Sequence, residues 1–81
     1  MGLLRRINWD LVQRIGHNLQ YDSEINRTKL ARTCRMKYVL CVEYLEWMEQ
    51  LNLITVGRHV RLTEQGYRMI MTNDQRNILA E

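Results

Sequence analysis

The stretch Leu53-Ile54-Thr55-Val56-Gly57-Arg58-His59-Val60-Arg61-Leu62 decides the fold. It contains two short alternating runs rich in β-branched residues, Leu53–Val56 and His59–Leu62, on either side of a Gly-X dipeptide. This pattern predicts a tight antiparallel hairpin with a type II′ turn at Gly57-Arg58. Because two short strands are marginal alone, we expect the hairpin to pack on helices.

Two helices joined by a turn are predicted immediately before the hairpin. Asn26 is a good N-cap for a short helix that runs through about Cys34 and buries Leu30 and Ala31. Arg35-Met36 forms the expected turn, and a longer helix follows from about Lys37 to Leu51. The residues on its apolar face are Tyr38, Cys41, Leu45 and Met48, with Tyr44 and Leu51 at the edge. Asn52 tolerates the left-handed conformation that ends many helices.

Further helices are predicted at both ends of the chain. The first is an amphipathic helix with Asn8 as its cap, Asp10 in its first turn and the apolar positions Ile7, Leu11, Val12, Ile15 and Leu19. Polar residues 21–24 form a loop after it. Thr63 caps a short last helix whose apolar face is Tyr67, Ile70 and Met71. Polar residues 72–77 either fray this helix or carry it on towards Ile78 and Leu79.

The predicted order is α-α-α-β-β-α in a single domain over residues 1–81, mainly α with a small two-stranded β-wing. A hairpin after the third helix is the arrangement of a winged helix-turn-helix. Three segments carry a resemblance to a known family: Tyr44-Leu45-Glu46-Trp47-Met48, Leu53-Ile54 and Leu62-Thr63-Glu64-Gln65-Gly66. With them, residues 26–70 resemble the archaeal-type winged helix-turn-helix domains of small transcriptional regulators and chromatin-associated proteins.

The resemblance implies binding to duplex DNA through the third helix and the wing, by a homodimer. Dimers of this family often form through the terminal helices. The last helix is expected to be short here, and its far half is polar. We therefore expect a small dimer contact through the first or last helix rather than a long coiled coil.

Charge points to the same partner. The formal net charge is +3, and the segment Ile25–Val42 holds five cationic residues and no acidic one. Basic charge on a helix-turn-helix is typical of a DNA-binding protein. The candidate DNA-binding residues are Arg27, Lys29 and Arg32 at phosphates, Arg35, Lys37 and Tyr38 in the major groove, and Arg58 and Arg61 on the wing. Tyr38 reads equally well as a core residue, and Arg61 as an ordinary surface strand residue.

The sequence contains no pattern typical of an enzyme, a metal-binding protein or a membrane protein. The chain has no phosphate-binding glycine loop, metal-ligand cluster or catalytic triad, so we expect no enzyme, metal, cofactor or small-molecule ligand. Cys34 and Cys41 have neither redox nor zinc spacing and read as buried thiols in a reducing compartment. No apolar run suits a membrane span or a signal peptide, which predicts a cytoplasmic, nucleoid-associated protein.

Two alternatives to a sequence-specific regulator stay open. The first is a winged-helix protein-interaction module of a transcription, replication or chromatin assembly. Val39, Val42 and Trp47, expected to be exposed beside an acidic row on the third helix, favour it, as does Trp9. The second is a protein that coats chromatin by charge alone.

Overall fold

The computed structural model describes the backbone of residues 7–80 and the side chains of residues 7–72. Its elements are α1 (Trp9–Tyr21), α2 (Arg27–Thr33), α3 (Tyr38–Gln50), β1 (Ile54–Val56), β2 (Val60–Leu62) and α4 (Glu64–Ala80). The fold is mainly α with a two-stranded antiparallel sheet, and the predicted order α-α-α-β-β-α is confirmed.

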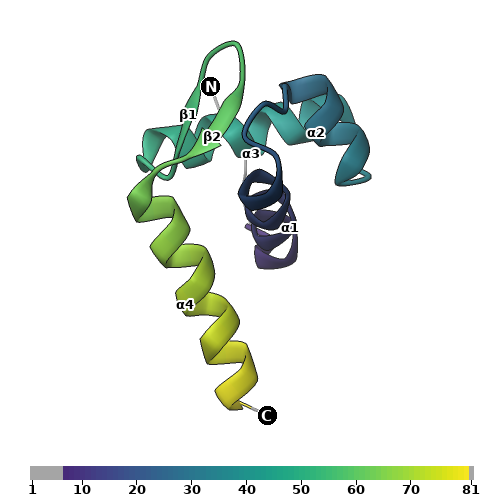
Figure 1. Ribbon diagram of the computed structural model, residues 1–81. Helices are drawn as coiled ribbons and strands as arrows, with labels where there is room; N and C mark the ends of the chain where they lie inside the picture. Colours follow the sequence, from purple (N-terminus) through teal and green to yellow (C-terminus); the bar gives the residue numbers. More distant parts are fainter. Residues whose placement is uncertain (1–6, 81) are drawn as a thin grey trace.

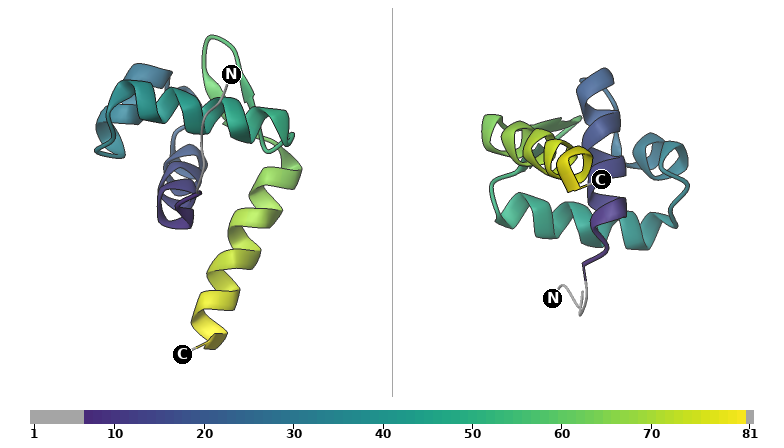
Figure 2. Two further views of the ribbon diagram at one scale, coloured as in Figure 1. Left: turned by 180° about the vertical axis from the view of Figure 1, so that it is seen from behind. Right: turned by 90° about the horizontal axis from the view of Figure 1, so that it is seen from below.

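The elements divide between two ends of the molecule. The hairpin and α2 lie at one end, on either side of the long axis of α1, and α3 runs across the molecule beside them (Figure 1). Helices α1 and α4 extend towards the opposite end and pack against each other (Figure 2). The tip of the hairpin and the C-terminal end of α4 are therefore far apart.

Three helices begin with the side-chain caps that the sequence predicts. Asn8 Oδ1 accepts a hydrogen bond from the Asp10 amide at 2.9 Å, and Asn26 Oδ1 accepts one from the Lys29 amide at 2.8 Å. Thr63 Oγ1 accepts from the Gly66 amide at 3.0 Å. Each cap satisfies an amide that has no partner inside its own helix.

Helices α2 and α3 end in the same way, with one residue in the left-handed conformation. Arg35 (φ 58°) follows α2 and Asn52 (φ 62°) follows α3. Each is followed by an amide that bonds back to the last turn, from Met36 to the Ala31 carbonyl and from Leu53 to the Met48 carbonyl, both at 2.9 Å. This is the Schellman arrangement, which turns the chain sharply out of a helix.

The core receives buried side chains from every element. Its members are Val12, Ile15, Leu19, Ile25, Leu30, Ala31, Cys34, Cys41, Tyr44, Leu45, Met48, Leu53, Ile54, Val60 and Ile70. The predicted burial of Leu30 and Ala31 on α2 is confirmed, as is that of Cys41, Leu45 and Met48 on α3.

Three tyrosines differ from their predicted burial. Tyr44, expected at the edge of α3, is buried, and its hydroxyl accepts a hydrogen bond from the Asn8 amide at 3.0 Å. Tyr38 and Tyr67, expected on apolar faces, are about half exposed. On α4 the predicted burial of Ile70 is confirmed, and the second buried position among its described side chains is Gly66, one turn before it.

The predicted type II′ turn is wrong. Ile54 pairs with Leu62 and Val56 with Val60, so the loop has three residues, Gly57 to His59. No glycine in the described chain has a positive φ, which a type II′ turn requires. A two-residue loop would have placed Ile54 opposite Arg61, and therefore on the same face, whereas the observed register puts Ile54 and Val60 together in the core.

Helix α4 is longer than expected. It continues through the polar residues 72–77 to Ala80, and its 17 residues make it the longest helix of the described chain. None of the helices in residues 7–80 combines the length and apolarity that crossing a membrane requires.

Candidate nucleic-acid interface

Helix α2 presents its cationic residues to solvent because its apolar positions are used by the core. Leu30 and Ala31 are buried, while Arg27, Lys29 and Arg32 are exposed. Lys29 Nζ lies 3.5 Å from Asp22 Oδ2, an ion pair that partly neutralises it. Arg27 and Arg32 have no ion pair within the described residues. Two of the three predicted phosphate contacts on this helix are thus unneutralised.

The turn between α2 and α3 carries two more exposed cations, Arg35 and Lys37. Lys37 occupies the N-cap position of α3, and no side chain caps this helix. The first turn of α3 also contains no acidic residue. The amides of that turn and the positive end of the helix dipole add to the positive potential around Arg35 and Lys37.

A residue that sequence reasoning missed holds this turn in place. Arg14 of α1 donates from Nη1 to the Cys34 carbonyl at 3.1 Å and from Nη2 to Asp10 Oδ2 at 2.7 Å. Asn18 Nδ2 donates to the Arg14 carbonyl at 2.8 Å and lies 3.5 Å from Cys34 Sγ. No local pattern in the sequence indicates these contacts, because they join residues 16 and 20 positions apart.

Burial keeps the two thiols beside this turn protonated. It raises the pKa of Cys34, which Arg14 and the Asn18 amide oppose, and it raises the pKa of Cys41 from 9.0 to about 11, with a further rise from the nearby Cys34. A thiol with a raised pKa is a poor nucleophile and a poor metal ligand. In the residues whose side chains are described, no group of His, Cys, Asp and Glu could hold a metal ion.

The start of α3 exposes two apolar surfaces. Val39 is 71% exposed and Tyr38 is 47% exposed. Val42 and Trp47, expected to be exposed, are half-buried instead. The Trp47 ring packs edge to face on Trp9 of α1, with ring centroids 6.1 Å apart and an interplanar angle of 72°. The apolar side chains of α3 that are open to a partner before its C-terminal end therefore lie in its first turn.

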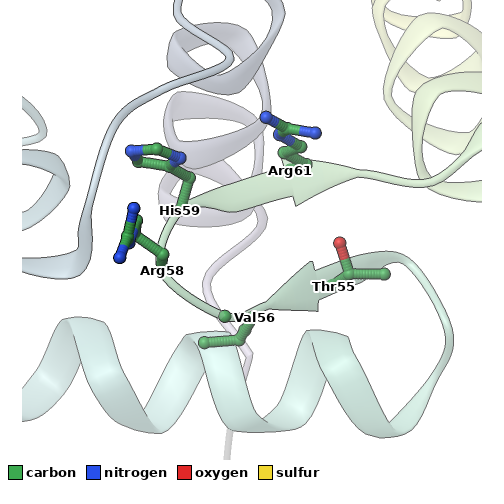
Figure 3. Close-up of a pocket in the computed structure, with 6 residues that line it drawn as sticks. Thr55, Val56, Arg58, His59 and Arg61 are labelled. Atoms are coloured by element: carbon green, nitrogen blue, oxygen red, sulfur yellow. The ribbon is translucent and has the colours of Figure 1, made fainter.

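The hairpin carries the second basic segment. An open depression of about 320 Å³ lies along it, lined by Thr55, Val56, Gly57, Arg58, His59 and Arg61. Arg58 and His59 extend from the loop, and Arg61 extends from β2 (Figure 3). Arg58 is exposed and has no ion pair among the described residues, so its charge is available to a ligand.

Arg61 has a structural contact that sequence reasoning did not foresee. Its Nε donates to the Ser23 carbonyl at 3.1 Å, and the neighbouring Val60 amide donates to the Ile25 carbonyl at 2.9 Å. The hairpin is thereby joined to the segment that leads into α2. Because only Nε is used, the rest of the guanidinium remains exposed to solvent.

The predicted site residues therefore fall into two groups at one end of the molecule, α2 with its following turn and the hairpin (Figure 1). Comparison with known proteins adds no family. No protein-family model matches the chain, and no curated protein is significantly similar to it.

Proposed function

We propose that this chain is a winged helix-turn-helix protein that binds duplex DNA and regulates transcription. The observation that carries the proposal is a set of exposed cations without ion pairs in the described structure, confined to α2, the following turn and the hairpin. These residues are Arg27, Arg32, Arg35, Lys37, Arg58 and Arg61. By contrast, the exposed cations elsewhere among residues 7–72, Arg14 and Arg68, each pair with a carboxylate four residues away.

In this proposal the first turn of α3 enters the major groove. Arg35 and Lys37 meet base edges or phosphates there, and Val39 is exposed enough to contact a thymine methyl group. Arg27 and Arg32 contact phosphates on one side of the groove. The hairpin places Arg58 and Arg61 on the flanking groove, where arginine commonly contacts the backbone or the minor groove.

A homodimer is part of the proposal. An 81-residue chain has a small core, and a two-fold dimer would present two copies of α3 to successive turns of DNA. The length of α4 supports a dimer contact through this helix. Light scattering on the purified protein tests this point directly, and a monomer mass at micromolar concentration would count against it.

Titration of fluorescent duplexes with the protein tests DNA binding. One duplex has a random sequence and the other lies upstream of the protein's own gene, and each is measured at two salt concentrations. Affinity should fall with salt by a slope of about −0.9 per phosphate neutralised. Tighter binding to the upstream duplex indicates a specific regulator, and equal, salt-sensitive binding indicates a protein that coats DNA.

A matched pair of variants locates the contact. Arg58→Ala removes an unpaired cation of the hairpin, whereas Arg68→Ala removes an exposed cation that is already paired with Glu64 at 3.2 Å. Arg58→Ala should weaken binding and lower the salt slope by about one phosphate, and Arg68→Ala should change neither appreciably. Equal effects of the two variants would contradict binding through the hairpin.

A protein-interaction module is the second candidate, and the 71% exposure of Val39 beside Tyr38 favours it. This candidate predicts no binding to either duplex at low salt. It also predicts that Val39→Asp abolishes binding to a copurifying partner while leaving the fold intact.

A further inference from the structure

The residue at the end of α2 is an unusual choice for its backbone conformation. Arg35 occupies the left-handed position of a Schellman motif, where glycine is the commonest residue. The corresponding residue after α3 is Asn52, which tolerates this conformation. For an arginine the left-handed conformation is unfavourable, because the Cβ atom comes too close to the following carbonyl oxygen. A strained residue persists when the surrounding structure holds it, and strain of this kind is concentrated at functional sites.

The side chain of Arg14 holds the backbone at Arg35 in this conformation. The carbonyl that accepts from Arg14 Nη1 belongs to Cys34, and this carbonyl is part of the peptide group that joins Cys34 to Arg35. The Arg35 Cα lies between two peptide groups, and their orientations determine where its side chain points. The contact from Arg14 fixes the orientation of the first of these peptide groups. The direction in which the Arg35 side chain leaves the backbone therefore depends on a contact made by α1.

Arg14 is itself well held. Its Nη2 donates to Asp10 Oδ2 at 2.7 Å, and its main-chain carbonyl accepts from Asn18 Nδ2 at 2.8 Å. A planar guanidinium that uses two nitrogens on two different acceptors has little rotational freedom left. Asn18 also contacts Cys34 Sγ, so Arg14 and Asn18 of α1 both bind Cys34, the residue before Arg35.

We propose that Arg14 is a positioning residue, which fixes the turn after α2 so that Arg35 contacts DNA. This inference rests on the proposed function. It assigns a role in recognition to α1, whose Arg14 is paired with Asp10 and would otherwise be considered a surface ion pair of no consequence.

A double-mutant cycle on DNA affinity tests the proposal. The four proteins are the wild type, Arg14→Ala, Arg35→Ala and the double variant, each titrated with the same duplex. If Arg14 acts through Arg35, Arg14→Ala should weaken binding about fivefold when Arg35 is present and less than about twofold when Arg35 is already alanine. Equal weakening in the two backgrounds overturns the proposal, because Arg14 then contributes only charge or general stability.

Two further variants keep the test decisive. Arg68→Ala removes a cation that is paired with a carboxylate four residues away, as Arg14 is, and it should leave affinity unchanged. Arg14→Lys keeps the charge and a long donor, and its affinity should lie between those of the wild type and Arg14→Ala. If thermal unfolding shows that Arg14→Ala is not folded at the assay temperature, Arg14→Lys replaces it in the cycle.

The two proposals fail in different ways. A wild-type protein that shows no salt-sensitive binding to either duplex overturns the proposed function and this inference with it. A wild-type protein that binds, with independent effects of Arg14 and Arg35, overturns only the role of Arg14.

Discussion

Gly16 of α1 packs directly against Ile70 of α4, so closely that a Cβ atom at position 16 would lie 2.6 Å from both Cγ1 and Cδ1 of Ile70. Ile70 is fully buried, so a shift of its side chain would disturb the close-packed core around it. Glycine lowers the intrinsic stability of a helix interior by about 1 kcal/mol relative to alanine. The close approach of α4 is the reason why glycine is present at the centre of α1.

Gly16→Ala should therefore destabilise the protein even though alanine is the better helix former. Overpacking a core costs about 1–3 kcal/mol, which exceeds the gain in helix propensity over most of that range. Thermal unfolding followed by circular dichroism measures the effect. Adding Ile70→Ala to Gly16→Ala should cost less than Ile70→Ala costs alone, because the added methyl group fills part of the cavity. Additive effects would contradict a direct contact.

Gly66→Ala should be more damaging than Gly16→Ala. A Cβ atom at position 66 would overlap the main-chain carbonyl oxygen of Leu53, and main chain cannot rotate away as a side chain can. The expected result is a loss of more than about 3 kcal/mol or failure to fold. Gly57→Ala is the matched control, since nothing lies within 4 Å of its position and no positive φ has to be kept. A stable Gly66→Ala protein would refute this packing of α4 on the residue before β1.

Arg35→Gly should separate stability from binding. Glycine removes the left-handed strain, which should raise the free energy of unfolding by about 1 kcal/mol after allowing for the greater freedom of the unfolded chain. For a domain of this size, the unfolding midpoint should rise by about 4–8 °C. DNA affinity should fall, because the cation is lost.

Arg35→Ala is the control for this effect. It removes the same cation and keeps the left-handed strain, so it should weaken DNA binding equally without raising the unfolding midpoint. A midpoint that stays unchanged in Arg35→Gly would show that the arginine is not strained.

Thiol reactivity should report unfolding. Cys34 and Cys41 are fully buried and burial raises both pKa values, so a thiol reagent at about pH 8 should label the protein only as fast as it opens. The raised pKa also predicts alkaline destabilisation. The folded Cys41 keeps its proton to about pH 11, whereas the unfolded thiol loses its proton near pH 9.0. The free energy of unfolding therefore keeps the full contribution of Cys41 below about pH 9, and this contribution is lost as the pH rises towards 11.

Two observations would contradict these expectations. Rapid labelling of the native protein would show that a thiol is accessible. A free energy of unfolding for Cys41→Ala that falls as steeply as that of the wild type above pH 9 would show that the alkaline loss arises elsewhere.

Much of the fold can be predicted from local signals. Asn8, Asn26 and Thr63 cap their helices as expected, and Asn52 ends α3 in the left-handed conformation, because each signal acts within a few residues. The predicted two-residue loop is wrong, since the register implied by a turn at Gly57-Arg58 would put Ile54 and Val60 on opposite faces, whereas both are buried in the core. Comparing which side chains would share a face gives the correct register from the same ten residues.

The site was only partly accessible to sequence reasoning. The absence of acidic residues from 25–42 identified the cationic segment, and the structure exposes Arg27, Arg32, Arg35 and Lys37 there. The supporting contacts could not be found in this way, because they are tertiary. The hydroxyl of Tyr44, the guanidinium of Arg14 and that of Arg61 each bond to main chain in a distant segment.

The bonds that β2 makes to Ser23 and Ile25 have a consequence for how the protein adapts to its ligand. They set the spacing between α2 and the hairpin through the segment that joins α1 to α2, and one of them is made by Arg61, itself a candidate contact residue. Substitutions in residues 22–24 can therefore widen or narrow that spacing while every candidate contact residue is retained. A change in the path of this short segment would fit the protein to a different groove geometry and leave its set of cations unchanged.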